Sequence, residues 1–391
     1  MSSQSVVVCG TGIVGLAAAL GLARARIGVS LVGPQRVLPP VTPTLWCPRV
    51  YALSPTSQAF LESIGVWGLV DPQRIVPVRA MQVLGDTGGR LSLDAWQGAE
   101  DALAYIVESD EIERVLQQAV KLYGVQWLDG RFQSIEPSGI KTESGQLVAA
   151  DLIVGADGAG SPVREAAGIA HHSRAYNETG VVTHLTVQYP HQGTAWQWFT
   201  PEGVVALLPM PDTPEGPQVS LVWSMPSAQA DACLALPQDE QAQWLERHLA
   251  AVAGDVMGKL VVRAPVYGFP LFVEHSGMIG QRVALVGDAA HRVHPLAGQG
   301  LNLGLGDVET LVNGLRSRQS YQSVSDPKVL ARYRRERAEP VLAMRCVTDG
   351  LQRLFALNSA PAAALRNAGM SLVNQIPFIK RRLIENASGR R

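Results

Sequence analysis

One segment of the chain combines an acidic turn, a glycine-rich loop and an expected helix start. The strand-like apolar run Arg282–Val286 leads into the turn that carries Asp288. After the glycine-rich loop, the backbone N–H groups of Gly300, Leu301 and Asn302 begin an expected helix, where they stabilise negative charge. A reduced flavin carries its negative charge at the N1–C2 carbonyl edge, and Asp288 can accept a hydrogen bond from a ribityl hydroxyl. The segment therefore predicts FAD and chemistry that passes through the reduced anion.

A second motif, near the N-terminus, is Gly10-Thr11-Gly12-Ile13-Val14-Gly15. The β-branched run Ser5–Cys9 predicts a buried strand before it, an Ala- and Leu-rich helix is expected to about Ala25, and Val29–Val32 predicts the next strand. In this order the first glycine permits the tight turn, the second lets backbone approach a pyrophosphate, and the third lets the helix pack on the strand. The motif predicts dinucleotide binding; the alternative is an ordinary glycine-rich turn.

The acidic residue that usually ends the second strand, on the ribose hydroxyls, is missing. Gly33 stands at this place and is followed by Pro34, Gln35 and Arg36. Gln35 and Arg36 are the two candidates to replace it.

A second acidic turn, Asp157-Gly158, follows the apolar run that begins at Asp151. Asp157 can bind ribityl or pyrophosphate-linked groups through water, and Ser161 and Arg164 can stabilise the turn. Taken alone, the pattern fits equally an Asp-Gly turn capped by its own side chain.

The composition excludes several classes of function. The 391 residues suffice for two or three domains, and a net charge of −1 gives no field for nucleic acid. The four cysteines are far apart, without metal-ligand spacing, and neither H-E-x-x-H nor C-x-x-C occurs, so no metal site is expected. The uncharged run Val6–Ala23 has no preceding Lys or Arg and contains four glycines, so it is not interpreted as a targeting or membrane segment. We expect a cytoplasmic protein.

The remaining patterns predict an α/β fold: a Rossmann-like FAD-binding domain interrupted by an antiparallel substrate sheet, with C-terminal helices. Four apolar or alternating runs predict the inserted sheet: Val181–Val187, Ala195–Phe199, Val204–Leu208 and Val219–Ser224. Helices are expected from about Leu330 onward, broken at Pro340, Pro361 and Pro377. The expected parts are a discontinuous FAD-binding domain (1–75, 101–180, 275–335), a substrate domain (76–100, 181–274) and a C-terminal helical segment (336–391).

Taken in order along the chain, the three turns resemble the flavoprotein aromatic hydroxylases of the p-hydroxybenzoate hydroxylase type. Further stretches resemble the FAD-dependent hydroxylases of ubiquinone biosynthesis over nearly the whole chain. These stretches are Arg49–Ser54, Tyr105–Glu108, Pro190–Ala195, Ala206–Pro209, Gly298–Gly304 and Leu365–Met370 with Lys380.

The resemblance implies a set of FAD-binding residues: Gly10, Gly12, Ile13, Val14, Gly15, Arg49, Asp157, Gly158, Asp288, Gly300, Leu301 and Asn302. Pro295, Gly298 and Gly300 would lie at the flavin edge through their backbone, with no side-chain acid or base assigned. The resemblance also implies that NAD(P)H reduces the flavin and that O2 adds to give a peroxyflavin, which hydroxylates a polyprenylated phenol of ubiquinone biosynthesis.

Some residues near these motifs have plainer interpretations. His291 and His294 are expected to be turn residues or neighbours of the site, not proton-transfer groups. Glu108 is expected to cap a helix, and Arg49 to contact the flavin and not a surface carboxylate. The basic residues Lys380–Arg382 have apolar neighbours, which fits both a peripheral membrane contact at the inner membrane face and a solvated helix end.

Three other functions are weighed. Trp196–Pro201 superficially resembles the W-x-W-x-I-P motif of flavin-dependent halogenases, but Thr200 replaces the isoleucine and packing explains both tryptophans. A catabolic hydroxylase of a small phenol shares the fold, although the tail residues favour the ubiquinone-biosynthesis enzymes. The absence of an acidic residue at Gly33 motivates the third alternative, a non-catalytic, FAD-poor subunit of a biosynthetic assembly. For the hydroxylase itself, other proteins of ubiquinone biosynthesis or a lipid carrier are the partners considered besides the polyprenylated substrate and O2.

Overall fold

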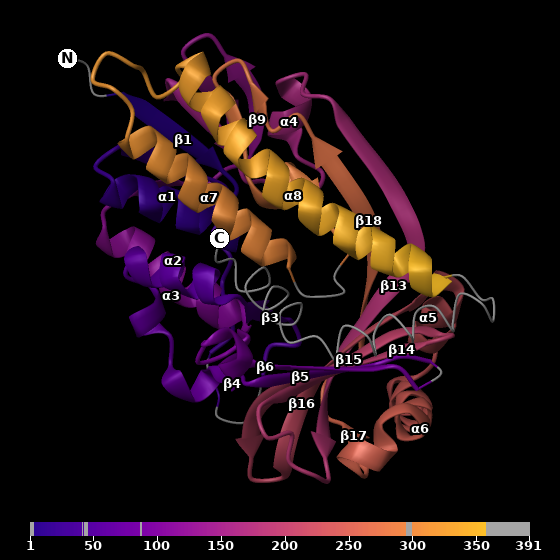
Figure 1. The fold of residues 1–391 in the computed structure, drawn as a ribbon. Coiled ribbons are helices and arrows are strands. Elements are labelled where there is room, and N and C mark those ends of the chain that lie inside the picture. The colour runs from indigo at the N-terminus through magenta and orange to yellow at the C-terminus, as the bar shows by residue number, and fades with distance from the viewer. Residues whose placement is uncertain (1–3, 41, 43–45, 87, 295–298, 357–391) are drawn as a thin grey trace.

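A parallel sheet forms the first part of the fold in a computed structural model, which describes residues 4–40, 42, 46–86, 88–294 and 299–356 (Figure 1). Its order is β19 (Ile279–Gly280), β20 (Val283–Leu285), β12 (Leu152–Gly155), β1 (Ser5–Cys9), β2 (Gly28–Val32) and β8 (Gln126–Leu128). All neighbours are parallel except β19, which pairs antiparallel with β20. The strands expected at Ser5–Cys9 and Val29–Val32 are confirmed to within one residue.

Helices pack around this sheet. They are α1 (Ile13–Arg24), α2 (Pro55–Ser63), α3 (Ser109–Leu122), α4 (Pro162–Ala166) and α7 (Gly300–Arg316). α1 is apolar on nearly all sides, because α3 and α7 both pack against it and the sheet lies beneath it. The short 3-10 helices are η1 (Trp67–Leu69), η2 (Pro72–Arg74), η3 (Ala95–Gly98) and η4 (Gly287–Ala289).

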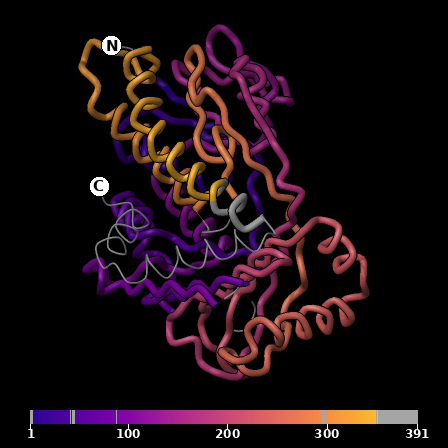
Figure 2. The backbone as a smooth tube through the Cα atoms, turned by 45° about the vertical axis from the view of Figure 1, so that its right-hand side comes forward, coloured from indigo at the N-terminus to yellow at the C-terminus, as the bar shows by residue number. Residues whose placement is uncertain are grey.

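The second part is a nine-stranded, mostly antiparallel sheet (Figures 1 and 2). Its strands are β5 (Ala80–Leu84), β6 (Arg90–Asp94), β13 (His171–Val187), β14 (Thr194–Thr200), β15 (Gly203–Thr213), β16 (Gly216–Pro226), β17 (Leu260–Val262), β18 (Tyr267–Ser276) and β21 (His291–Arg292). The four strands expected for the inserted sheet are β13 to β16, and each is longer than its apolar run. The fold class is therefore as expected.

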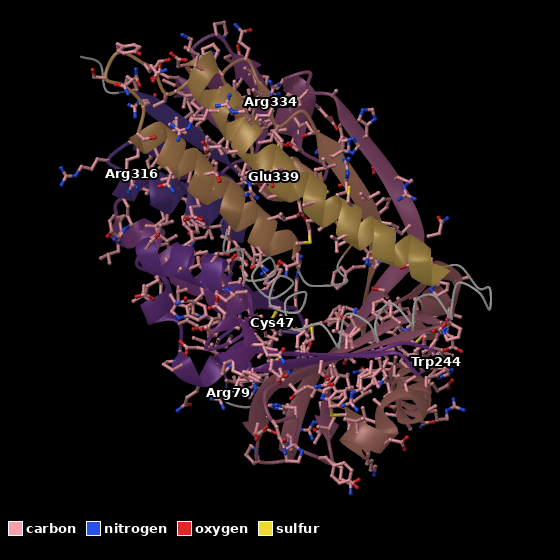
Figure 3. The ribbon with its side chains drawn as sticks, viewed as in Figure 1. Cys47, Arg79, Trp244, Arg316, Arg334 and Glu339 are labelled. Atoms are coloured by element: carbon pink, nitrogen blue, oxygen red, sulfur yellow. The ribbon has the colours of Figure 1, made fainter. Side chains whose placement is uncertain are left out.

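Helices α5 (Ser227–Leu234) and α6 (Gln238–Met257) cover one face of this sheet. Trp244 on α6 stacks against Trp223 of β16, with ring centroids 5.7 Å apart, and Figure 3 shows Trp244 on this outer side. The opposite face is turned toward the dinucleotide-binding part, and Cys47 lies between the two (Figure 3).

Two small antiparallel sheets complete the fold. One contains β3 (Val50–Leu53), β7 (Ala104–Glu108) and β4 (Val76–Val78), and the other contains β9 (Phe132–Glu136), β10 (Gly139–Thr142) and β11 (Leu147–Ala149). The first of them matters for the site, because β3 follows directly after Arg49 and β7 leads directly into α3.

The expectation that Pro340 breaks the C-terminal helix is wrong. α8 runs from Pro327 to Ala356 and includes Pro340 (Figure 1). A proline removes one backbone hydrogen bond, but α8 packs along α7, and the buried ion pair Arg337–Asp307 holds it just before the proline. The positions of Pro361 and Pro377 lie outside the described residues.

The expected domain limits cut two continuous elements. Residue 180 lies inside β13, and the limit at residue 335 lies inside α8. β13 is a 17-residue strand that pairs with β16 and β18 on both sides of that limit. Within the described part of the chain, no helix is both long and apolar enough to span a bilayer.

Candidate active site

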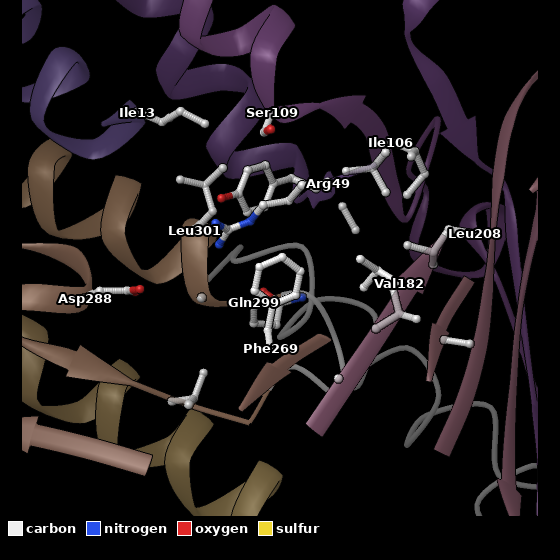
Figure 4. A pocket seen from close by; sticks show the side chains of 18 of the residues that line it. Ile13, Arg49, Ile106, Ser109, Val182, Leu208, Phe269, Asp288, Gln299 and Leu301 are labelled. Carbon is white, nitrogen blue, oxygen red and sulfur yellow. The ribbon is translucent and has the colours of Figure 1, made fainter. Parts of the chain in front are cut away.

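A cavity of about 1040 Å³ lies where the parallel sheet meets the nine-stranded sheet (Figure 4). The turns after β1, β12 and β20 border it, because these strands are neighbours in register: Cys9 pairs with Gly155, and Gly155 pairs with Leu285. Ligands of parallel sheets bind at this edge, outside the carboxyl ends of the strands. The topology therefore brings together three motifs that are more than 120 residues apart in sequence.

The space around the glycines of the first turn is compatible with the roles predicted from the sequence. Gly10 has φ +117°, and a Cβ placed on it would lie 2.2 Å from the carbonyl oxygen of Ala156. A Cβ on Gly15 would lie 2.0 Å from the carbonyl oxygen of Gly10. Gly12 differs, since a Cβ there meets nothing within 4 Å, and Gly12, Ile13 and Val14 line the cavity. The open backbone at the start of α1 fits an approaching pyrophosphate.

Asp288 and Arg49 reach the same cavity from different elements. Asp288 lies in η4, directly after β20, and its carboxylate is open to the cavity (Figure 4). Desolvation by burial raises the pKa of Asp288, and the positive charges of Arg292 and Arg49 act in the opposite direction. The Arg49 guanidinium lies 5.1 Å from the centre of the Tyr51 ring and is not paired with a carboxylate of the described residues. The two side chains thus offer an acceptor and a donor to a ligand.

The start of α7 forms another wall of the cavity. Gln299, Gly300 and Leu301 line it, and a Cβ on Gly300 would meet nothing within 4 Å. The side-chain hydrogen bonds of Asn302 are not predicted from the sequence. Its side chain accepts a hydrogen bond from the Ser54 backbone N–H at 2.9 Å and donates one to the Ala52 carbonyl at 2.9 Å. Asn302 therefore fixes the start of α7 against the β3 strand. The catalytic candidates Pro295 and Gly298 lie outside the described residues.

Asp157 holds its own turn together. Oδ2 accepts a hydrogen bond from the Val163 backbone N–H at 3.0 Å, at the start of α4. Burial raises its pKa, and Oδ1 is buried without a hydrogen-bond partner among the described residues. Gly158, and not Asp157 itself, is among the residues that line the cavity. The turn-capping interpretation thus holds for Oδ2, whereas Oδ1 is an unpaired acceptor next to the cavity wall.

Arg164 connects the two acidic turns. Its guanidinium donates to the Ala159 carbonyl at 2.7 Å and to the Ala289 carbonyl at 2.9 Å. Arg164 is buried, as is Ser161, whose hydroxyl caps the first turn of α4. Both stabilise the turn as expected, and Arg164 in addition sets the spacing between the Asp157 and Asp288 turns.

The two histidines lie behind the cavity wall. Nε2 of His291 lies 2.7 Å from Oδ2 of the fully buried Asp307, and Nε2 of His294 lies 2.9 Å from Oε2 of Glu178. Neither histidine lines the cavity, which agrees with the expectation that they are not proton-transfer groups there. Burial acts to raise the pKa of Asp307, but His291 and Arg337 outweigh it and the pKa is lowered.

The far arm of the cavity is apolar. It is lined from the sheet by side chains such as Met81, Val182, Leu208 and Val222, and from β7 by Ile106. Tyr267 and Phe269 of β18 border it as well. Trp196 and Trp198 of the halogenase-like motif are two residues apart on β14, so their side chains lie on the same face of the strand, where their rings stack with centroids 5.7 Å apart. Trp198 is part of the core beneath α6 and Trp196 packs against that core, while Trp196 is also among the residues that border the cavity. Packing therefore accounts for both tryptophans, as expected from the sequence.

The ion pairs of Arg36 and of Glu108 are not predicted from the sequence. Arg36 forms ion pairs with Asp110 at 2.9 Å and Glu113 at 3.0 Å, and all three residues line the cavity. Glu108 was expected to cap a helix; it occupies the cap position of α3, but its side chain makes no capping bond and pairs with buried Arg74. Arg36 had been considered as a replacement at the ribose site, but its acidic partners on α3 are more than 70 residues away and gave no local signal.

These features fit a bound flavin dinucleotide. The open backbone at Gly12 and Gly300 leaves room for close approach, and the buried Oδ1 of Asp157 is an acceptor with no hydrogen-bond partner in the described part of the chain. The described residues contain no group of three or more His, Cys, Asp or Glu side chains placed to hold a metal ion.

Comparisons with known proteins agree with this geometry. The FAD binding domain family model matches residues 3–347. The chain is 33% identical to "Ubiquinone hydroxylase UbiL" of Rhodospirillum rubrum, over 98% of this chain and 89% of that protein. It is 30% identical to the 3-demethoxyubiquinol 3-hydroxylase of Escherichia coli, over 98% of each chain.

Solved structures show the same fold. The p-nitrophenol 4-monooxygenase PnpA of Pseudomonas putida superposes with a TM-score of 0.76 at 20% identity, over 99% of this chain and 100% of that one. PqsL of Pseudomonas aeruginosa, a probable FAD-dependent monooxygenase, also gives 0.76, at 21% identity, over 94% of this chain and 99% of that one.

Proposed function

Because this chain belongs to the FAD-dependent hydroxylases of ubiquinone biosynthesis, we propose that it hydroxylates the aromatic ring of a polyprenylated phenol precursor of ubiquinone. The observation that carries the proposal is one continuous cavity. Its polar end is bordered by the three motif turns, and its other end is walled by apolar side chains of the nine-stranded sheet. Such a cavity can hold a dinucleotide and an apolar ring substrate at the same time.

FAD supplies the redox chemistry, with NAD(P)H as the electron donor and O2 as the oxygen source. The protein binds and orients it. We assign the pyrophosphate to the backbone at Gly12, Ile13 and Val14, and the ribityl chain to Asp288. Arg49 lies across the cavity and can neutralise phosphate charge (Figure 4).

The start of α7 would stabilise negative charge on the bound cofactor. The backbone N–H groups of Gly300, Leu301 and Asn302 belong to the first turn of α7 and have no partner within the helix, so this terminus favours negative charge nearby. Asn302 holds this terminus in place through its bonds to Ser54 and Ala52. Pro295 and Gly298, in the preceding loop, are proposed as further backbone neighbours of the flavin edge.

The apolar arm positions the substrate ring and excludes water. The side chains of Met81, Ile106, Val182, Leu208 and Val222, which line this arm, carry no charge, so a polyprenyl chain is stabilised there by burial. No acid or base is assigned to the arm. The protein's contribution is placement of the ring and protection of the reaction from solvent.

The test is the purified protein with a series of candidate substrates. We expect a yellow protein whose visible flavin absorption bleaches with NAD(P)H and returns with O2. Polyprenylated phenols should stimulate NAD(P)H oxidation and yield a product that contains one oxygen atom from 18O2, whereas p-nitrophenol and salicylate should not. Product analysis then gives the ring position. Preference for the small phenols would favour a catabolic enzyme, and protein that cannot be loaded with FAD would favour the non-catalytic subunit.

We also propose that the substrate is delivered at a membrane surface, on the cytoplasmic side, or by a lipid carrier. The composition of the segment Ile376–Ile384, three consecutive basic residues among apolar ones, supports this, although the segment lies outside the described residues. Flotation with anionic vesicles, comparing the full chain with a Lys380→Glu/Arg381→Glu/Arg382→Glu variant, tests it. Equal flotation of both would contradict the role of this segment.

A further inference from the structure

The usual acidic ligand of the adenosine ribose is excluded at the end of β2. Gly33 has φ +149°, and a Cβ there would lie 2.8 Å from Cγ2 of Thr11. Thr11 cannot simply turn away, because its hydroxyl donates a 2.7 Å hydrogen bond to the Pro34 carbonyl. An Asp or Glu at position 33 would therefore be strained. A carboxylate that binds the ribose hydroxyls must then come from another element of the fold.

Helix α3 borders the chain just beyond β2. The Gln117 side chain donates to the Arg36 carbonyl at 3.1 Å, and Arg114 donates to the Pro39 carbonyl at 2.9 Å. These bonds fasten the segment after Gly33 along α3, which also packs against α1. The N-terminal half of α3 thus lies beside the strand end where dinucleotide folds bind the ribose.

Two carboxylates from this half of α3 line the cofactor cavity with Arg36. Asp110 and Glu113 keep only 7% and 6% of their surface exposed, whereas the side chain of Arg36 is half exposed. Oε2 of Glu113 pairs with Arg36 at 3.0 Å, and Oε1 accepts from Gln117 at 3.2 Å. A carboxylate has about four acceptor positions, so one bond on each oxygen leaves capacity for a ligand.

We propose that Glu113, oriented by Arg36 and Gln117, accepts hydrogen bonds from the adenosine ribose hydroxyls of FAD, in place of the acidic residue that Gly33 replaces. Glu113 is favoured over Asp110 because Arg36 and Gln117 orient both of its carboxylate oxygens, whereas Arg36 and Ser109 both contact the same oxygen of Asp110. The inference rests on the use of FAD in the proposed function and is independent of the ring substrate.

The test is FAD titration of the apoprotein, followed by flavin fluorescence. A charge-assisted hydrogen bond contributes enough that Glu113→Ala should weaken FAD binding about ten- to a hundredfold. Glu111→Ala is the matched control on the same helix. Glu111 is equally buried and bonds Arg114 at 3.3 Å, but it does not line the cavity. The control should bind FAD like the wild type.

An FAD analogue whose adenosine ribose lacks the 2′ and 3′ hydroxyls separates ligand contact from a structural role. The wild type should bind the analogue more weakly than FAD, and Glu113→Ala should bind both alike, which is the coupling a direct contact requires. Equal affinity of the wild type for FAD and the analogue would overturn the inference, as would equal losses for both ligands in Glu113→Ala. A wild type that binds FAD but hydroxylates nothing would refute the proposed function and leave this inference standing.

Discussion

Asp307 is the residue whose loss should most disturb the polar half of the site. Its Oδ2 accepts from the Gly287 backbone N–H at 3.0 Å and lies 2.7 Å from Nε2 of His291. Its Oδ1 accepts from Nε of Arg337 at 2.7 Å. One buried carboxylate on α7 thereby fixes the turn that presents Asp288 and anchors α8. The perturbation is Asp307→Asn, which keeps the size of the side chain and removes its charge.

The expected loss in the free energy of unfolding follows from the partners that Arg337 keeps in the variant. Arg337 is 8% exposed, and of its hydrogen bonds to described residues it would keep the one to the Leu303 carbonyl, at 3.0 Å, with the carboxylate of Glu309 as the remaining nearby negative charge. Removing one partner of a buried ion pair costs about 3–5 kcal/mol. Because asparagine keeps one acceptor oxygen, we expect about 3 kcal/mol, a large share of the 5–15 kcal/mol that stabilises a typical domain.

The assay is urea unfolding of the apoprotein, with Glu336→Gln as the control. Glu336 pairs with Arg332 at 2.7 Å on the exposed side of α8, and exposed pairs contribute at most about 1 kcal/mol. The double variant Asp307→Leu/Arg337→Met should recover part of the loss, since apolar side chains leave no unpaired charge. A loss below about 1 kcal/mol for Asp307→Asn would refute this reasoning, as would a double variant less stable than the single one.

Three further predictions concern the cofactor and pH. Asp288→Ala should weaken FAD binding at least about tenfold in the same titration, because its open carboxylate is the expected ribityl acceptor; unchanged flavin occupancy would count against this placement. Gly300→Val should leave the apoprotein folded, since its Cβ meets nothing within 4 Å, but slow flavin reduction or hydroxylation in stopped-flow measurements; normal turnover would exclude a role for this edge. The lowered pKa of Asp307 stabilises the fold fully above the ordinary aspartate pKa of about 4, and this stabilisation is lost as the pH falls below it. Acid titration of unfolding should show this loss in the wild type and not in Asp307→Asn.

The parts of the fold that the sequence predicts well are those in which local pattern and tertiary packing agree. The run Ser5–Cys9 is apolar because β1 lies between β12 and β2. Gly10 and Gly15 are required because a Cβ at either position would collide with a carbonyl oxygen, that of Ala156 for Gly10 and that of Gly10 for Gly15. Pro340 shows the converse. Its local signal predicts a break, but packing along α7 and the Arg337–Asp307 pair hold the helix together. Glu108 likewise stands at a helix start but is engaged by Arg74, from a segment that no local pattern connects to it.

The acidic turns after β12 and β20 show why the site needs the structure as well as the motifs. Both place an aspartate just after a buried strand at the same sheet edge, so their local sequences predict equal roles. α4 begins within a few residues of Asp157, and the Val163 backbone N–H in its first turn donates a hydrogen bond to one carboxylate oxygen of Asp157. The corresponding support at Asp288 comes from Asp307, which bonds the Gly287 N–H and leaves the Asp288 carboxylate open to the cavity. Asp288 is thus available to a ligand because Asp307, 19 positions later in the sequence, stabilises the turn by accepting the hydrogen bond from the Gly287 backbone N–H.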